Sequence, residues 1–125
     1  IKVEIMIPGK SDIKFTPDAA FYKANQLRKK GADIHIFNGG FHHSKIMMID
    51  SVYCTVGSTN LNSRSLRFDY EVNAFIFDKE TTDELIQMFK EDQEDSVLLT
   101  AEMYKKRTPW KKFIGWFAHL FTPFL

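Results

Sequence analysis

The chain has 125 residues, of which 44% are hydrophobic and 26% are charged, and its formal net charge is +1. These values predict one globular domain. They exclude a strong positive field over the whole molecule, so any site for nucleic acid would have to be a local basic patch. The one cysteine, Cys54, lies in an apolar run and cannot form an internal disulfide, so we interpret it as a small buried residue.

The first part of the chain predicts two strands around one helix. Residues 2–8 form an apolar run that ends at a Pro-Gly pair, which is typical of a strand. A helix is predicted between Thr16, whose hydroxyl suits an N-cap, and Gly31, which suits a helix end. Residues 32–38 predict a second strand, and a Gly-Gly pair interrupts the chain directly after it.

The middle of the chain predicts three more strands and a second helix. Residues 45–50 and 53–58 are apolar and are separated by a short turn, so they predict two neighbouring strands. Residues 60–69 are polar and lack a period, which predicts a loop, and residues 70–78 predict another strand. Residues 79–95 combine helical spacing of apolar residues with many carboxylates, which predicts an amphipathic helix with an acidic, solvated face.

The C-terminal residues differ in composition from the rest of the chain. From Met103 onward there is no Asp or Glu, while Lys, Phe and both Trp residues gather there. We therefore predict a layered α/β domain, with a mixed β-sheet flanked by helices, over residues 1–102 and a basic, aromatic helical tail over residues 103–125. The tail suits either a membrane interface, with aromatic rings at headgroup depth and lysines on anionic lipid, or an ordinary core.

Several polar residues and one glycine interrupt the apolar strands at a regular spacing. Alternate residues of a strand face the same side, so the first two, a histidine and a lysine, are expected to project together. The next strand returns beside the first and carries the serine and asparagine at its far end, where glycine allows a close backbone approach. The residues are His43, Lys45, Asp50, Gly57, Ser58 and Asn60.

These residue types suit chemistry on a phosphodiester. An imidazole acts as a nucleophile or proton shuttle near neutral pH, and a lysine supplies a fixed positive charge for phosphate oxygens. Asparagine and serine add hydrogen-bond donors. We therefore expect histidine to attack phosphorus while lysine and asparagine stabilise the negative charge. We expect no metal or other cofactor, because the cationic side chains supply the charge.

The spacing resembles a known signature. The segment HSKIMMID…GSTN matches every fixed position of the HKD motif of the phospholipase D superfamily, H-x-K-x(4)-D-x(6)-G-S-x-N. The segments IMIPGK, EVNAFIFD and TPWKKF…FTPFL, together with the acidic helix, resemble the second half of bacterial cardiolipin synthases. This resemblance covers residues 2–125 and implies a phospholipase D-like half-domain.

The resemblance implies transfer of a phosphatidyl group between two phosphatidylglycerol molecules, which forms cardiolipin and releases glycerol. Similar enzymes carry two such motifs in one polypeptide, after transmembrane helices. The chain begins at Ile1 without a Met, so we expect it to be a piece of a longer protein. We expect an N-terminal half, outside this chain, that carries the other HKD motif and an anchor in the bacterial membrane. We expect the active site on the cytoplasmic side.

The resemblance also implies a role for each motif residue. In the family, one motif histidine forms a phosphohistidine intermediate and the other is the general acid and base. His43, in the second half, would be the acid and base. The sequence leaves both roles open for it. Lys45 and Asn60 match phosphate-binding positions, and Ser58 is a neighbouring donor. Asp50 is interpreted as structural.

Glu71 lies in the apolar strand predicted over residues 70–78, where a carboxylate must be paired or near solvent. The resemblance implies that it orients a catalytic histidine by accepting its ring N–H. The alternative is a salt bridge to Arg64 or Arg67. His42 alternates with His43 and is therefore expected at the surface or in packing.

Two other functions remain open on the sequence. A nuclease of the same superfamily could form its site from two copies of this chain, although the near-zero charge argues against nucleic acid. A non-catalytic module could bind anionic phospholipid or a membrane surface through the basic tail. Against this, a pure binder has no need for His43 together with Glu71.

Overall fold

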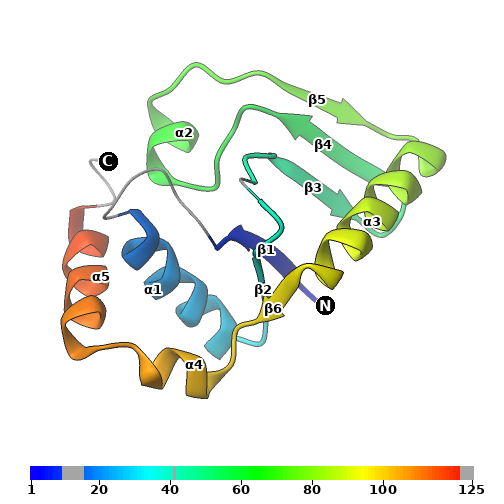
Figure 1. Cartoon of the computed structure of the whole chain (residues 1–125). Coiled ribbons are helices and arrows are strands. Elements are labelled where there is room, and N and C mark those ends of the chain that lie inside the picture. The colour runs from blue at the N-terminus through cyan, green and yellow to red at the C-terminus, as the bar shows by residue number, and fades with distance from the viewer. Residues whose placement is uncertain (10–15, 41, 122–125) are drawn as a thin grey trace. The chain divides into compact units, whose positions relative to one another are not determined.

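The computed structural model describes residues 1–9, 16–40 and 42–121. These residues form six strands and five helices (Figure 1). The chain divides into two compact units, one made of residues 1–42 with 95–121 and the other of residues 43–94. None of the helices in the described residues has the length and apolar character needed to cross a membrane.

The first unit contains a three-stranded mixed sheet with the order β1-β2-β6. Strand β2 pairs in parallel with β1 and antiparallel with β6. The strands are β1 (Glu4–Pro8), β2 (Asp33–Phe37) and β6 (Ser96–Leu98), and the helices of this unit are α1 (Thr16–Lys29), α4 (Ala101–Lys106) and α5 (Pro109–Phe121).

Helix α1 ends at the glycine that the sequence predicts. Gly31 has a φ of 98°, which L side chains rarely adopt. The amide of Ala32 donates to the carbonyl of Leu27, and that of Gly31 to the carbonyl of Arg28, which is the Schellman pattern. The chain therefore turns directly into β2, where the buried side chain of Ile34 joins the core of the first unit.

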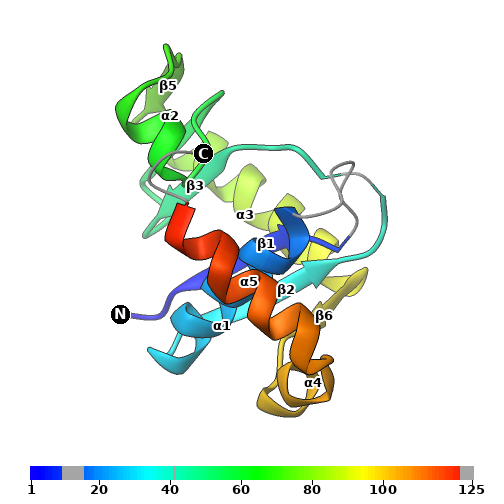
Figure 2. The same cartoon turned by 90° about the vertical axis from the view of Figure 1, so that its left-hand side faces the viewer.

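Helix α5 packs closely against α1 (Figure 2), and the two helices lie side by side in both views. Gly115 is buried at the contact, and a Cβ placed there would lie 3.3 Å from the Cβ of Tyr22. Arg107, just after α4, forms an ion pair with Asp18 and lies over the ring of Phe21, with its guanidinium carbon 4.3 Å from the ring centroid. One face of the predicted tail is therefore held by α1.

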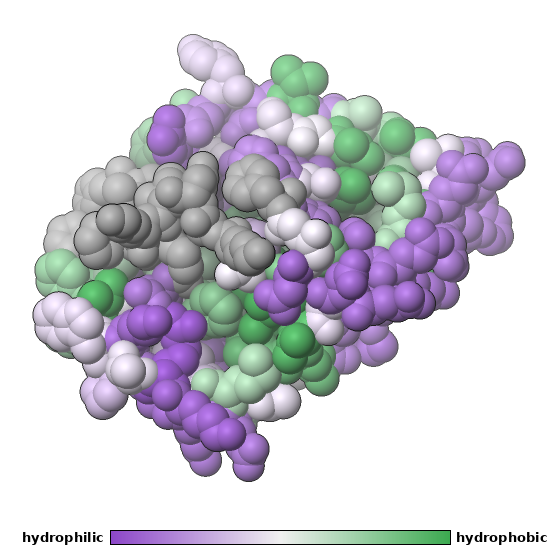
Figure 3. Space-filling view, in the orientation of Figure 1, coloured by the Kyte–Doolittle hydropathy of each residue, from purple (hydrophilic) through white to green (hydrophobic). Residues whose placement is uncertain are grey.

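The second unit is an antiparallel sheet with one long helix on it. Strands β3 (Ile46–Ile49), β4 (Tyr53–Gly57) and β5 (Asn73–Ile76) pair in chain order, and a short helix, α2 (Ser63–Arg67), lies between the last two. Helix α3 (Lys79–Glu94) contacts β3 and β4. Cys54 is fully buried, as predicted. The outer side of α3 is strongly hydrophilic (Figure 3).

The predicted α/β class with a mixed sheet is confirmed, but some local predictions were wrong. The segment 60–69, predicted as a loop, contains α2, because the Asn62 side chain accepts the Ser65 amide at 2.7 Å and begins a helical turn. The strand predicted over 70–78 is shorter, since β5 covers Asn73–Ile76; just before its start, the Val72 amide donates to the Ser58 hydroxyl instead of a strand carbonyl.

Strand β6 was not predicted, because its two apolar residues, Val97 and Leu98, cannot be distinguished in the sequence from the end of the preceding amphipathic helix. The predicted boundary between residues 102 and 103 falls inside α4. The division into a domain and a separate tail stays a prediction.

Candidate active site

All the predicted site residues belong to the second unit, and all except Asp50 lie around one end of its sheet. His43 and Lys45 lie just before β3, where they are exposed and half-buried respectively, and not within a strand. Sheet pairing still reaches Lys45, because its carbonyl accepts the Gly57 amide at 3.2 Å. The Lys45 ammonium donates to the His43 carbonyl at 2.6 Å, so this lysine is fixed against the backbone of the motif histidine.

Asp50 occupies the turn between β3 and β4, at the opposite end of these strands from His43. Asp50 and Ser51 have φ values of 51° and 53°, and the Val52 amide donates to the Ile49 carbonyl at 3.1 Å. Positive φ at both central residues is the combination that type I′ hairpin turns require, and aspartate tolerates it better than most residues. This location supports the structural interpretation of Asp50.

Gly57 ends β4 in close contact with β5. A Cβ on Gly57 would lie 2.6 Å from the Cα of Asn73 and would also clash with the Val72 carbonyl. Only glycine permits this approach, which was expected from the sequence. Ser58 and Asn60 follow directly, and both side chains are exposed.

Glu71 accepts hydrogen bonds from two serine hydroxyls. Ser58 donates to its Oε2, and the same Ser58 oxygen accepts the Val72 amide at 3.0 Å. The bond from Ser58, followed by one from Ser65, lowers the pKa of Glu71 below its ordinary value, and the positive charges of Lys45 and Arg64 act in the same direction. Glu71 is therefore ionised at neutral pH, within electrostatic reach of Lys45.

Arg64 is one of the two arginines proposed as partners of Glu71 in the alternative to a histidine-orienting role. Arg64 directs its Nε to Asp69 at 3.0 Å, so its ion pair is with a different carboxylate. Orientation of a catalytic histidine by Glu71 stays a prediction. The sequence predicted Glu71 inside a strand, but it lies two residues before β5. Its carboxylate therefore needs no partner in a sheet interior.

Ser65 is a site residue that the sequence analysis missed. It is 7% exposed on α2 and donates to Glu71, while its own oxygen lies 3.5 Å from the Asn60 amide nitrogen. Ser65 therefore links Asn60 to Glu71. The signal that could have found it is the Asn-x-x-Ser spacing from Asn62, which is typical of a capped helix start.

Among the remaining polar residues of this region, His42 packs against Phe37 edge to face, with ring centroids 5.2 Å apart, as expected for a packing residue. Within the described residues, no three His, Cys, Asp or Glu side chains gather in a group that could hold a metal ion. The arrangement instead presents an imidazole, an ammonium, an amide and hydroxyls, which are groups that bind phosphate oxygens.

Comparison with known proteins agrees with this chemistry. Residues 1–93, which include every predicted site residue, match the family described as "Cardiolipin synthase, PLD-like domain". The chain belongs to this family. No solved structure gives a significant match.

Curated relatives of this family match the chain over its whole length. Cardiolipin synthase 1 of Staphylococcus epidermidis is 42% identical over 125 residues, and the cardiolipin synthases of Listeria monocytogenes and Listeria welshimeri are 39% identical over 125 residues. The match covers 100% of this chain and 26% of each relative, so the chain spans about a quarter of the length of these cardiolipin synthases.

Proposed function

We propose that this chain is the second HKD half of a cardiolipin synthase-type phosphatidyltransferase. The observation that carries the proposal is the complete motif, whose residues all belong to the second unit, in a chain that is 42% identical to a cardiolipin synthase. The substrates would be two phosphatidylglycerol molecules, and the products cardiolipin and glycerol.

The reaction would proceed in two displacements. In the first, the imidazole nitrogen of one motif histidine attacks the phosphorus of phosphatidylglycerol, the bond from phosphorus to the glycerol oxygen breaks, and the other motif histidine protonates the departing glycerol. In the second, a hydroxyl of another phosphatidylglycerol gives its proton to that same histidine and attacks phosphorus, which breaks the phosphorus–nitrogen bond. His43 would take one of these two histidine roles.

The other site residues would bind and position the phosphate. Lys45 would neutralise a phosphate oxygen as a fixed cation, and Asn60 and Ser58 would donate hydrogen bonds to the charge that develops in the transition state. Glu71 would orient a histidine ring from its serine-held position. Asp50 and Gly57 would act through the turn and the strand contact that shape the sheet.

A second motif would have to complete this site, since each phosphohistidine step needs a nucleophile and a proton donor. The relatives have about four times the length of this chain, so the missing half is proposed to lie in the same polypeptide, with a second copy of the chain as the alternative. We propose that the enzyme works on the cytoplasmic side of a bacterial membrane, anchored by a segment outside this chain.

The test uses the parent enzyme, with both halves present, on phosphatidylglycerol vesicles, and follows the lipids by mass spectrometry. The unmutated enzyme is expected to form cardiolipin and glycerol, and His43→Ala to lose at least about a thousandfold in rate, as expected for removal of a nucleophile or acid-base group. His42→Ala is the matched control, because it removes the neighbouring histidine, which packs on Phe37, and should retain activity.

Other outcomes would redirect the assignment. A folded parent enzyme that forms no cardiolipin would contradict the synthase proposal. Cleavage of plasmid DNA by the purified chain alone would instead support the nuclease alternative.

A further inference from the structure

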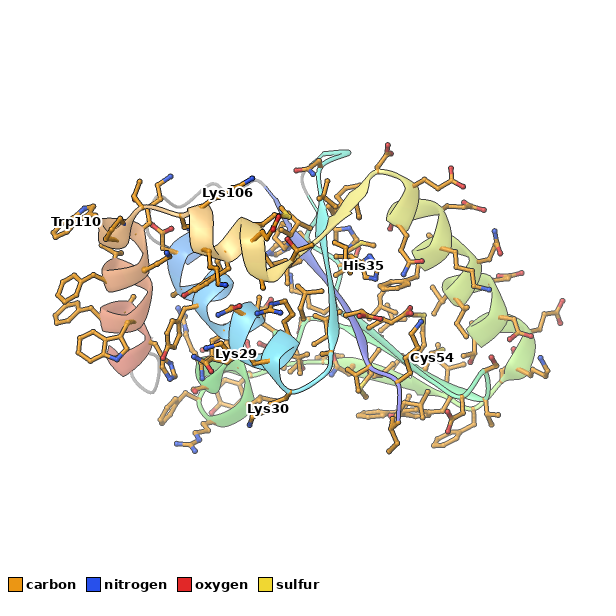
Figure 4. All side chains as sticks on the ribbon, turned by 90° about the horizontal axis from the view of Figure 1, so that it is seen from below. Lys29, Lys30, His35, Cys54, Lys106 and Trp110 are labelled. Atoms are coloured by element: carbon orange, nitrogen blue, oxygen red, sulfur yellow. The ribbon has the colours of Figure 1, made fainter. Side chains whose placement is uncertain are left out.

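Helix α5 carries a continuous row of exposed aromatic side chains on the side that faces away from α1 (Figure 4). Trp110, Phe113, Trp116 and Phe117 have exposed fractions of 68%, 50%, 45% and 48%. The other three rings all neighbour Phe113, whose centroid lies 5.9 Å from that of each tryptophan and 6.0 Å from that of Phe117. We name these four residues the aromatic row.

The opposite face of α5 is already occupied. Gly115 is buried against the backbone of Asp18, and His119 lies 5.2 Å from the ring of Tyr22. Since α1 holds that face, α5 cannot rotate to bury its aromatic rings in the first unit. The aromatic row is therefore displayed in a fixed orientation.

Positive charge surrounds the start of the aromatic row. Lys105, Lys106 and Lys111 are exposed, and Lys112 reaches back to the Lys105 carbonyl at 2.7 Å, which ties the end of α4 to the start of α5. No Asp or Glu follows Glu102 in the sequence. Lys111 and Lys112 therefore have no acidic residue in their own helix, whereas α4 carries one, Glu102, for its two lysines.

We propose that the aromatic row and its lysines form a docking surface for anionic phospholipid bilayers, the class of lipid that the proposed reaction uses. Trp and Phe side chains are favourable at the depth of the headgroups, where the apolar ring is buried and the indole N–H stays hydrated. Each lysine near an anionic surface adds about 1 kcal/mol of attraction. The inference deepens the proposed function by naming the surface that meets the membrane.

A protein partner fits this surface less well, because lysine is depleted in protein–protein interfaces whereas lysine beside tryptophan is typical of membrane interfaces. A second copy of the chain would place the two sets of lysines near each other, and each set of four has only Glu102 as a carboxylate in α4 and α5. The charge of the surface thus favours an anionic lipid over either alternative.

The chain contains its own reporters for the test, since both of its tryptophans, Trp110 and Trp116, belong to the aromatic row. The 125-residue chain, checked by circular dichroism, is titrated with vesicles of phosphatidylglycerol and phosphatidylcholine, and with vesicles of phosphatidylcholine alone. A blue shift of tryptophan emission on the first kind, reduced by added salt and absent on the second, is expected.

The double variant Phe113→Ser/Phe117→Ser keeps both tryptophans and is expected to bind at least about tenfold more weakly, because two rings no longer enter the bilayer. The control is Phe75→Ser/Phe77→Ser, which has the same composition but loses two exposed rings of the second unit, at 65% and 80% exposure. It should bind like the unmutated chain.

Several results would overturn the proposal. They are no shift on anionic vesicles with a folded chain, an equal shift on uncharged vesicles, equal losses in the two double variants, and a shift that grows with protein concentration without lipid. The last result would assign the aromatic row to self-association.

The docking surface and the proposed function fail separately. His43→Ala should bind vesicles as the unmutated chain does, because the docking assay involves no turnover. Vesicle binding without cardiolipin formation by the parent enzyme would refute only the synthase proposal, and the reverse result would refute only the docking surface.

Discussion

The motif residues of this chain form hydrogen bonds that cannot be read from the spacing of the motif. Ser58 is a fixed position of the HKD pattern, and its hydroxyl both donates to Glu71 and accepts the Val72 amide. Ser65 joins Glu71 to Asn60 from a separate helix. Ser58, which the sequence predicts as a hydrogen-bond donor to phosphate, is thus also the residue that binds the Glu71 carboxylate.

Replacing Ser58 by alanine tests this arrangement. Because the Ser58 hydrogen bond is the largest influence that lowers the pKa of Glu71, Ser58→Ala should raise that pKa toward its ordinary value. Carbon-detected NMR titration of the Glu71 carboxyl measures the change, with Thr59→Ala as the neighbouring control. An unchanged titration in Ser58→Ala would contradict the role given to this hydroxyl.

The sign of the linked stability effect follows from the same shift. A carboxyl whose pKa is lowered in the folded chain contributes its full stabilisation above the pKa of the unfolded state, and this contribution is lost as pH falls through the folded value. Stability of the unmutated chain should therefore decrease on acidification, and the part due to Glu71 should be smaller in Ser58→Ala. Urea unfolding at a series of pH values measures the difference.

At the scale of elements, the contact between β4 and β5 depends on Gly57. This contact brings Ser58 next to Glu71, although the two residues are separated by α2 and a connecting segment in the chain. The β3–β4 turn similarly depends on particular residues, since Asp50 and Ser51 must both adopt positive φ. Ser51 also hydrogen-bonds Asp83, which helps lower the pKa of that residue and links α3 to the turn.

Gly57→Ala is expected to destabilise the chain by about 1–3 kcal/mol, because the new methyl group would displace the β5 backbone. Chemical denaturation gives the free energy of unfolding. Gly40→Ala is the matched control, since a Cβ there has no heavy atom within 4 Å. Equal stability of the two variants would show that the close approach of β4 and β5 is not required.

At the scale of the whole molecule, the central feature is that one chain carries one motif. The relatives are about four times longer, and the proposed two-step reaction needs two histidines. We therefore expect the 125-residue chain alone to form no cardiolipin from phosphatidylglycerol. Adding the remaining part of the parent enzyme as a separate polypeptide should restore product, measured by mass spectrometry.

The control for this complementation is the same mixture with His43→Ala in the chain, which should remain inactive. Cardiolipin formation by the chain alone would contradict the need for the other half and favour a site built from two copies.

Part of this protein could be predicted from the sequence because its signals are local. The Schellman end at Gly31 depends on the φ that glycine allows, the amphipathic helix α3 on apolar periodicity, and the motif on fixed spacing within two neighbouring strands. The α/β class and the family required only these signals.

Only the tertiary structure decided the remaining features, because they depend on groups far apart in the chain. The serine partners of Glu71 require α2 and the end of β4 to meet, and β6 forms only because β2 offers an unpaired edge to a three-residue strand. Whether the aromatic tail would be core or surface depended on which of its faces α1 covers. Periodicity shows that a helix has two faces, but packing alone determines which one remains exposed.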